Sequence, residues 1–185
     1  MQVCQRYIAQ PALYGGRKFD LRILVAVRSF HPLQAYTWGE PFVRAANRRY
    51  DPTPAALGDF QTQFTSMRQG GFEEAAVSFA QLSAHFEAAG RGAQWQAAQA
   101  ATRTMLRSLL AAAAGPVTAA AGGGCLPRCR ALYGIDVMYD SSLAPQLLEV
   151  TFMPGVERPM AADGGFLNQV FGCLFLGETA GFRAL

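Results

Sequence analysis

The 185-residue sequence predicts an α+β fold in which a mostly antiparallel sheet packs against helices. Three patterns support this prediction. Residues 18–28 alternate between charged and apolar side chains and then become apolar on both sides, as expected for a strand that enters a core. Residues 131–152 form two strand-like runs joined by a turn sequence, which indicates a hairpin. Residues 72–110 carry apolar side chains at helical spacing.

The first part of the chain is typical of short strands and turns. We expect strands at residues 3–8, 18–28, 33–39 and 41–46, with the 33–39 strand antiparallel to 18–28. Residues 48–60 contain several prolines and an Asp-Pro pair, so this segment is expected to be a loop.

We expect three helices in the rest of the chain. The first has an apolar stripe at residues 72, 75, 76, 79, 82 and 86 and ends at Gly90. The second turns Trp95, Ala98, Met105, Leu106, Leu109 and Leu110 toward a core. The third is capped by Asp163 and buries Phe166, Leu167, Val170, Phe171, Leu174 and Phe175. The Ala/Gly-rich tract 111–124 is expected to be a loose loop.

Two carboxylates face each other in the predicted hairpin. With a tight turn at Ser142–Leu143, Asp136 lies opposite Glu149, and Gly134 lies opposite Thr151 on the same face. The other face is then an apolar layer of Ile135, Val137, Leu148, Val150 and Phe152. Facing carboxylates repel, but a Mg²⁺ ion between them would make a site that substrate phosphates complete. The alternative is an ordinary solvated hairpin face.

The strand at residues 18–28 places Lys18, Asp20 and Arg22 on one side and apolar residues between them. Two cations and a carboxylate in a row suit a triphosphate, because the cations meet phosphate oxygens and the carboxylate orients them. The alternative is a surface salt-bridge ladder, which is common and contributes little to stability. Together with the hairpin, the row indicates a phosphate–metal site.

Composition narrows the classes of function. A hydrophobic share of 51% and a charged share of 16% are typical of a globular protein. The net charge of +3 is small, and the sequence has no run of Lys and Arg that would indicate a nucleic-acid-binding surface. The sequence shows no signal peptide and no apolar run of membrane-spanning length, so we expect a cytoplasmic protein that does not bind membranes.

Four segments resemble the tubulin–tyrosine ligase (TTL) family, whose members are ATP-grasp ligases that add amino acids to tubulin tails. They are QRYI (5–8), RKFDLR (17–22), FVRAANRRYD (42–51) and YGIDVMYDSSLAPQLLEVTFMP (133–154). Their order and approximate spacing match over residues 1–176, and residues 177–185 are expected to be a tail. Within the family, the chain looks most similar to the branch of the divergent twelfth TTL-like member.

The resemblance implies a fold and a set of ligands. The fold would be the carboxy-terminal portion of an ATP-grasp-like domain. ATP and Mg²⁺ would be cofactors, tubulin or microtubules the partner, and a small amino acid the second substrate. In the family the hinge contacts the adenine, and here the hinge is Gln5, Arg6, Tyr7 and Ile8, with the backbone near Arg6–Ile8 reading the adenine edge.

The same resemblance assigns roles to the charged residues. Lys18 and Asp20 would hold the nucleotide, and Arg22 would stabilise the reacting acyl phosphate. Arg44 matches an arginine associated with the acceptor or amino-acid substrate. The metal carboxylates match Asp136 and Glu149.

Three departures from the family pattern bear on activity. Thr151 stands where the family has the asparagine of Glu-Val-Asn, and a hydroxyl is a poorer metal ligand than an amide oxygen. The family's His-Leu-Thr-Asn is replaced by Gln-Phe-Thr-Ser at 63–66, so only Thr65 is kept, as a nucleotide-site residue. The chain also opens at the hinge, so we expect the amino-terminal lobe and its phosphate-binding lysine to precede Met1.

Two hypotheses remain open. The chain is either the carboxy-terminal half of a tubulin ligase, inactive by itself, or a non-catalytic descendant that binds nucleotide or tubulin. Thr151 and the lost histidine favour the second hypothesis, whereas the retained charged residues favour ATP binding. An unrelated ATP-grasp carboxylate–amine ligase is a more distant alternative.

Overall fold

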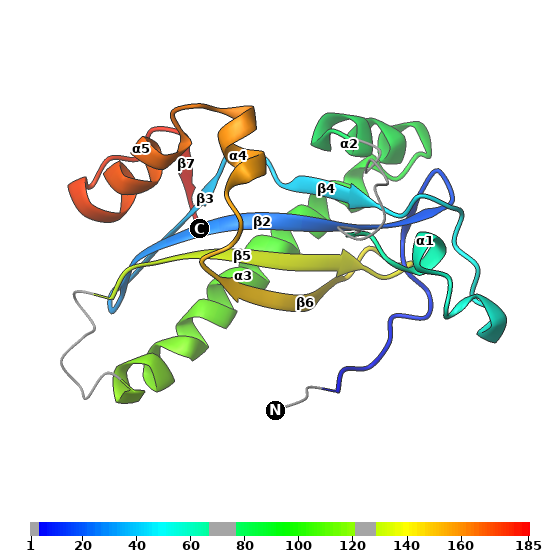
Figure 1. Cartoon of the computed structure of the whole chain (residues 1–185), viewed down its shortest axis with the longest axis horizontal. Helices are drawn as coiled ribbons and strands as arrows, with labels where there is room; N and C mark the ends of the chain where they lie inside the picture. Colours follow the sequence, from blue (N-terminus) through cyan, green and yellow to red (C-terminus); the bar gives the residue numbers. More distant parts are fainter. Residues whose placement is uncertain (1–3, 67–76, 121–128) are drawn as a thin grey trace. The chain divides into compact units, whose positions relative to one another are not determined.

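The structure is a computed structural model that describes residues 4–66, 77–120 and 129–185. Within these ranges the strands form a seven-stranded sheet of order β6-β5-β2-β3-β7, and β1 and β4 also pair with β2. The strands are β1 (Leu13–Tyr14), β2 (Arg17–Phe30), β3 (Leu33–Trp38), β4 (Phe42–Ala45), β5 (Ala131–Tyr139), β6 (Pro145–Phe152) and β7 (Phe182–Ala184). The long strand β2 has β5 on one side and β3 on the other (Figure 1).

Along the described part of the chain, three helices come between β4 and β5, and two follow β6. They are α1 (Phe60–Gln63), α2 (Phe79–Ala88), α3 (Gly92–Ala120), α4 (Glu157–Ala162) and α5 (Phe166–Phe171). A short 3₁₀ turn, η1 (Pro54–Ala56), precedes α1, and a π-helical segment, η2 (Gly172–Leu176), continues α5. The predicted α+β class with an antiparallel sheet is confirmed: β1, β3 and β7 pair with their neighbours in antiparallel register.

The chain divides into two compact units that share several elements. The first unit contains Met1–Leu21, Phe42–Ala98 and Val137–Leu147, and the second contains Arg22–Pro41, Gln99–Asp136 and Leu148–Leu185. Strands β2, β5 and β6 and helix α3 therefore each contribute residues to both units.

An aromatic cluster forms the core of the first unit. The Phe19 ring stacks on Tyr139 with centroids 6.1 Å apart, and Phe86 stacks on Trp95 at 4.8 Å. Phe86 comes from helix α2, whose start is stabilised by a reciprocal capping box between Ser78 and Gln81. All four aromatic side chains are at most 2% exposed.

The second unit is held by contacts between β3 and the carboxy-terminal helices. Trp38 packs edge-on against Phe166 with centroids 4.8 Å apart, and its indole N–H donates to Gln169 Oε1 at 2.7 Å. Asp163 accepts from the Gly165 N–H at 2.7 Å, one position before the helix, and also from the Gln169 amide. The prediction that Asp163 caps this helix is wrong, because the N-cap is Gly165 and, among the described residues, no side chain caps α5; Asp163 ends α4 and bonds to α5 from two residues before its N-cap.

Several sequence predictions of local structure are wrong. The described part of 3–8 contains no strand, and the tract 111–120 continues α3 because alanine's helix propensity outweighs Gly115 and Pro116. Residues 121–124 of that tract and the stripe positions 72, 75 and 76 lie outside the described residues. The expected tail 177–185 carries β7, which pairs with β3.

The predicted burial of several apolar residues on β6, α5 and η2 is also wrong. On β6, Val150 is 40% and Phe152 60% exposed, because β6 is an edge strand of the sheet. On α5 and η2, the exposed residues are Leu167, Phe171 and Phe175. The buried apolar residues Phe166, Val170 and Leu174 recur every fourth position and share one side of the helix, and Cys173 is buried beside Leu174.

Candidate functional site

Lys18 lies inside an aromatic setting in the first unit. Its side chain is nearly buried, with 4% of the residue exposed, and its ammonium donates to the Tyr7 hydroxyl at 3.2 Å. The ammonium also lies 4.8 Å from the Tyr7 ring centroid and 5.5 Å from that of Tyr50. Burial lowers the pKa of Lys18, and the charges of Tyr50 and Asp20 partly offset this effect. Lys18 is therefore held by protein groups rather than extended into solvent.

The hinge residue Tyr7 is tied to the loop around α1. Its hydroxyl donates to Gln63 Oε1 at 2.7 Å, and the Gln63 amide nitrogen donates to the Asp51 carbonyl at 2.8 Å. Sequence reasoning treated Gln63 only as a lost histidine, and it overlooked Tyr50. The signal that could have drawn attention to this loop is the retained Thr65, two positions after Gln63. In the structure both side chains are buried, and each contacts a residue predicted to bind the nucleotide.

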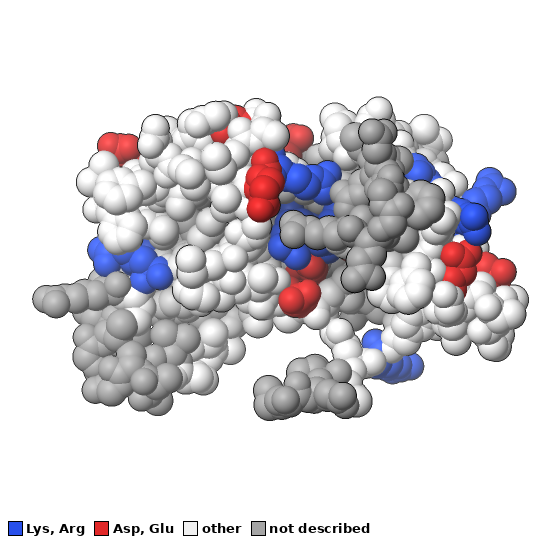
Figure 2. Space-filling view, in the orientation of Figure 1, with Lys and Arg blue, Asp and Glu red and all other residues white. Residues whose placement is uncertain are grey.

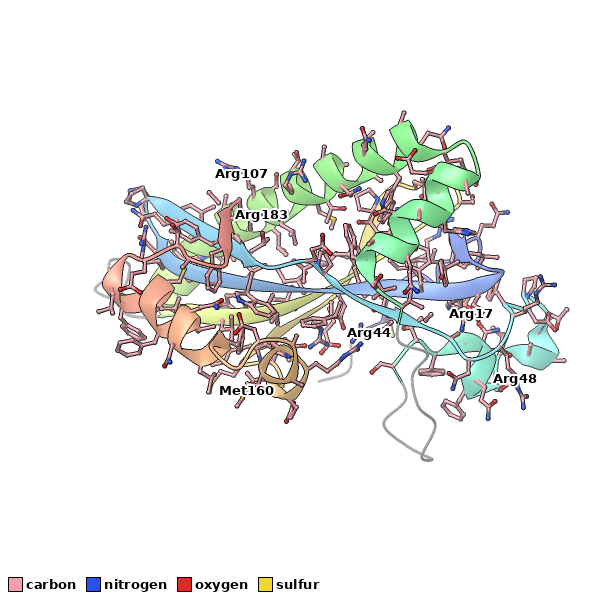
Figure 3. The ribbon with its side chains drawn as sticks, turned by 90° about the horizontal axis from the view of Figure 1, so that it is seen from above. Arg17, Arg44, Arg48, Arg107, Met160 and Arg183 are labelled. Carbon is pink, nitrogen blue, oxygen red and sulfur yellow. The ribbon has the colours of Figure 1, made fainter. Side chains whose placement is uncertain are left out.

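Asp20, Arg44 and Thr65 form a buried polar triad. Arg44 Nε donates to Asp20 Oδ1 at 2.6 Å, and the Thr65 hydroxyl donates to Asp20 Oδ2. The exposed fractions of the three residues are 1%, 8% and 9%. Arg44 extends inward from β4, whereas Arg48 lies at the periphery (Figure 3). The alternative of a surface salt-bridge ladder is therefore wrong for Lys18 and Asp20, because the hinge and the α1 loop contact them and both are buried.

The second unit contains Arg22 and the predicted metal ligands Asp136, Glu149 and Thr151. Arg22 holds the Asp136 carboxylate in a two-point ion pair, in which Nη2 donates to Oδ2 at 2.8 Å and Nε donates to Oδ1. The Asp136 side chain is 6% exposed and the Arg22 side chain 22% exposed. Such a forked geometry is the strong form of the arginine–carboxylate contact. Arg22 and Asp136 are thus brought together, as the sequence pattern predicts.

Glu149 and Thr151 lie together on β6, next to β5. The Thr151 hydroxyl donates to Glu149 Oε1 at 3.1 Å, which agrees with their predicted position on one strand face. The Met153 N–H donates to the Leu132 carbonyl at 3.0 Å, which fits the predicted hairpin register at that end. The turn itself is displaced by one residue from Ser142–Leu143: the Leu143 N–H donates to the Asp140 carbonyl, and Leu143 adopts φ +67°.

A pocket of about 580 Å³ lies in the first unit beside the hinge. It is lined by Arg6, Tyr7, Ile8, Ala9, Gln10, Asp140, Ser141, Ser142 and Gln146. Of the four predicted hinge residues, Arg6, Tyr7 and Ile8 line this pocket, together with the turn of the β5–β6 hairpin, and Gln5 does not. The turn is rigid because Asp140 accepts from the backbone N–H groups of Ser142 and Ala144.

The donor groups suit a Mg²⁺ ion in kind. Asp136, Glu149 and Thr151 offer carboxylate and hydroxyl oxygens, and Mg²⁺ commonly takes one or two carboxylates and completes its shell with water and phosphate. Among the described residues, no group of three or more His, Cys, Asp or Glu side chains could hold a metal by itself. The oxygens of Asp136, Glu149 and Thr151 are thus of the kind that a Mg²⁺ ion accompanied by phosphate would use.

Two further observations concern the charge of one face of the molecule and the hydropathy of the helices. The face seen in Figure 2 carries cations and anions in several small groups rather than a surface of single sign. Of the helices that the structure describes, none has the length and apolar character needed to cross a membrane.

Comparison with known proteins identifies the family. The model of the tubulin-tyrosine ligase family matches residues 1–183. The chain belongs to this family. The match includes both groups of charged residues described above and ends within β7.

Individual relatives within the tubulin–tyrosine ligase family agree with this assignment. The chain is 31% identical over 193 residues to mouse tubulin–tyrosine ligase-like protein 12, covering 96% of this chain and 30% of that protein. It is 27% identical over 180 residues to human "Probable tubulin polyglutamylase TTLL2", covering 88% of this chain and 28% of the relative. It is 29% identical over 179 residues to mouse "Probable tubulin polyglutamylase TTLL9", covering 87% and 35%. The chain thus spans about a third or less of the length of these relatives.

Proposed function

We propose that this chain is the nucleotide- and metal-binding part of an ATP-dependent ligase that attaches an amino acid to tubulin. One observation carries the proposal: the forked contact between Arg22 and Asp136. Acyl-phosphate chemistry requires a phosphate-binding cation beside a metal carboxylate, so that developing negative charge is stabilised from both sides. Family membership supplies the reaction class, and the relatives' names point to tubulin as the acceptor.

The proposed nucleotide contacts follow the geometry of the first unit. The backbone of Arg6–Ile8 would read the adenine, since these residues line the 580 Å³ pocket. Lys18 would contribute positive charge from behind Tyr7. Thr65 and Arg44 would act through Asp20, because both contact its carboxylate in the interior. Arg44 is therefore proposed as a positioning residue here, rather than as a group that touches the amino-acid substrate.

In the second unit, Asp136 and Glu149 would hold Mg²⁺ with the Thr151 hydroxyl beside them. The metal would neutralise charge on the reacting phosphates. Arg22 would bind phosphate oxygens by the same fork that it now directs at Asp136. We further propose that the protein works in the cytoplasm in association with microtubules, because tubulin is its proposed partner.

A second candidate function is nucleotide or tubulin binding without transfer. Thr151 supports it, because a hydroxyl replaces the family's asparagine and is engaged with Glu149. Gln63 supports it too, because this residue is occupied in holding Tyr7 and Asp51. This protein would bind Mg-ATP and tubulin but would not join an amino acid to the tail.

Incorporation of radiolabelled glutamate and tyrosine into tubulin separates the two functions. The assay compares this chain with the same chain extended by the part of a family member that it does not cover, each in the presence of ATP and each with and without Arg22→Ala. A ligase gives label with the extended wild-type protein and none with Arg22→Ala, while both remain folded by circular dichroism. Absence of label alongside retained ATP binding supports the second function. We expect no label from the 185-residue chain alone.

A further inference from the structure

We propose that Arg22 is an exchangeable counter-ion of Asp136, released when nucleotide phosphate binds, so that nucleotide and divalent metal enter the site as coupled ligands. The inference rests on the proposed nucleotide-binding function and adds a binding order to it. Its basis is the occupancy of Asp136: the guanidinium contacts both carboxylate oxygens. A metal that approaches Asp136 therefore meets a positive charge already in place.

The burial of the two partners decides which one moves. The Asp136 side chain is 6% exposed on β5, between buried Ile135 and Val137. A buried carboxylate needs a cation beside it to offset the cost of its burial. The Arg22 side chain is 22% exposed and has several rotatable bonds. Exchange thus means that the guanidinium swings away while the carboxylate stays and receives the metal.

Phosphate is a suitable partner for the released arginine. The guanidinium fork matches phosphate and carboxylate oxygens equally well in geometry, and a polyphosphate carries more negative charge than one carboxylate. A metal alone would have to displace Arg22 and leave that cation without a counter-ion near a divalent ion. A metal that arrives with nucleotide brings the replacement counter-ion with it. Metal binding at Asp136 is therefore weak alone and strong with nucleotide.

The lack of a side chain at Gly134 leaves the space that the Arg22 side chain occupies. A β-carbon at Gly134 would lie 2.8 Å from Arg22 Nη1, 2.9 Å from Arg22 Cδ and 2.9 Å from Pro154 Cβ. Contacts under 3.0 Å force a shift, and the flexible Arg22 side chain can move more easily than the Pro154 ring. Gly134→Ala therefore displaces the guanidinium from Asp136 without removing its charge, which gives a second and independent way to break the pair.

Direct binding of Mn²⁺, measured by electron paramagnetic resonance on the 185-residue chain without nucleotide, tests the exchange. Arg22→Gln is expected to tighten Mn²⁺ binding by roughly 5- to 150-fold, the ordinary range of coupling between two ligands. Gly134→Ala should act in the same direction. Arg28→Gln is the matched control, because Arg28 is also on β2 but bonds to Gln34 and Tyr36. Asp136→Asn should abolish the gain in an Arg22→Gln background.

A second titration measures ATP binding in EDTA by calorimetry. Arg22→Gln should weaken metal-free ATP binding, whereas Arg28→Gln should not. Mn²⁺ affinity that is unchanged or lower in both Arg22→Gln and Gly134→Ala overturns the exchange, even where ATP binds normally. Wild-type protein that binds no ATP with or without metal overturns the proposed function instead. Circular dichroism and urea unfolding verify that each variant is folded, and Gly134→Ala keeps the test available if Arg22→Gln unfolds.

Discussion

Asp20 and Arg44 form an ion pair that is buried almost completely, with Arg44 Nε 2.6 Å from Asp20 Oδ1. Their side chains are 2% and 10% exposed, so water screens the pair very little. The Thr65 hydroxyl occupies the other carboxylate oxygen. This arrangement satisfies a charged group inside the first unit and joins β2, β4 and the α1 loop. Arg44 therefore stabilises the folded first unit, a role that its sequence motif does not indicate.

Arg44→Ala is expected to destabilise the chain by about 3–5 kcal/mol, because it leaves the Asp20 carboxylate buried without its cation. Urea unfolding at pH 7 measures the loss. Arg48→Ala is the matched control: Arg48 is 3.4 Å from Asp59, the pair is exposed, and its removal should change stability by at most about 1 kcal/mol. Equal losses from the two substitutions would contradict a structural role for Arg44.

Gln63→His is expected to make the stability of the first unit sensitive to acid. Neutral histidine can accept from the Tyr7 hydroxyl as Gln63 does, but protonated histidine cannot, and Lys18 bonds to the same hydroxyl. Folding therefore lowers the histidine pKa below its unfolded value of about 6.5. Stability is full above that value and falls as the pH decreases through it, by about 1–3 kcal/mol when the bond is lost.

The free energy of unfolding of Gln63→His, measured relative to wild type between pH 8 and pH 5, tests this expectation. Gln63→Leu serves as the control, since it lacks the acceptor at every pH and should show a constant deficit. A difference between Gln63→His and wild type that does not vary with pH would show that Tyr7 does not depend on this acceptor.

Asp140 should contribute stability that is lost in acid. Burial tends to raise its pKa, but hydrogen bonds from Ser142, Ala144 and Gln146 outweigh burial, and the pKa is lowered below 3.8. The stabilisation is therefore present above the unfolded pKa and disappears as pH falls through the lower folded value. Asp140→Asn keeps an acceptor oxygen without a charge, so its unfolding midpoint in urea should decline less between pH 5 and pH 2.

Asp140→Ala complements that experiment because it removes the acceptor itself. It should destabilise the hairpin turn at all pH values, by about 1–3 kcal/mol for the backbone donors left without a partner. An acid profile of Asp140→Asn that is as steep as that of the wild type would assign the acid sensitivity to other carboxylates.

Alternation predicted the core side of β2 and could not predict the other side. Phe19, Leu21 and Ile23 are buried as their spacing indicates. Lys18 and Asp20 are buried as well, because the hinge and the α1 loop cover them from outside the sheet. A period of two identifies which residues share a face, but it contains no information about which distant loop lies over that face.

Edge position explains the other main difference. The hairpin sequence places Ile135 and Val137 on a face with Val150 and Phe152, yet only the β5 residues are buried. Strand β5 lies between β2 and β6, whereas β6 has one neighbour. Strand order depends on long-range pairing that local pattern does not encode. The closeness of Arg22 and Asp136 could be predicted, because the charged row and the hairpin together indicate one site, but their direct ion pair could not.

The edge position of β6 gives a final prediction. Ile135→Ala should destabilise the protein by about 2–5 kcal/mol, since the side chain is fully buried and its removal leaves a cavity. Phe152→Ser should cost much less, because Phe152 is 60% exposed and its main ring contact is Tyr133, with centroids 5.9 Å apart. Thermal and urea unfolding of both variants give the comparison. A large loss for Phe152→Ser would mean that β6 is covered in solution, and Tyr133→Leu then distinguishes loss of the ring contact from burial by another surface.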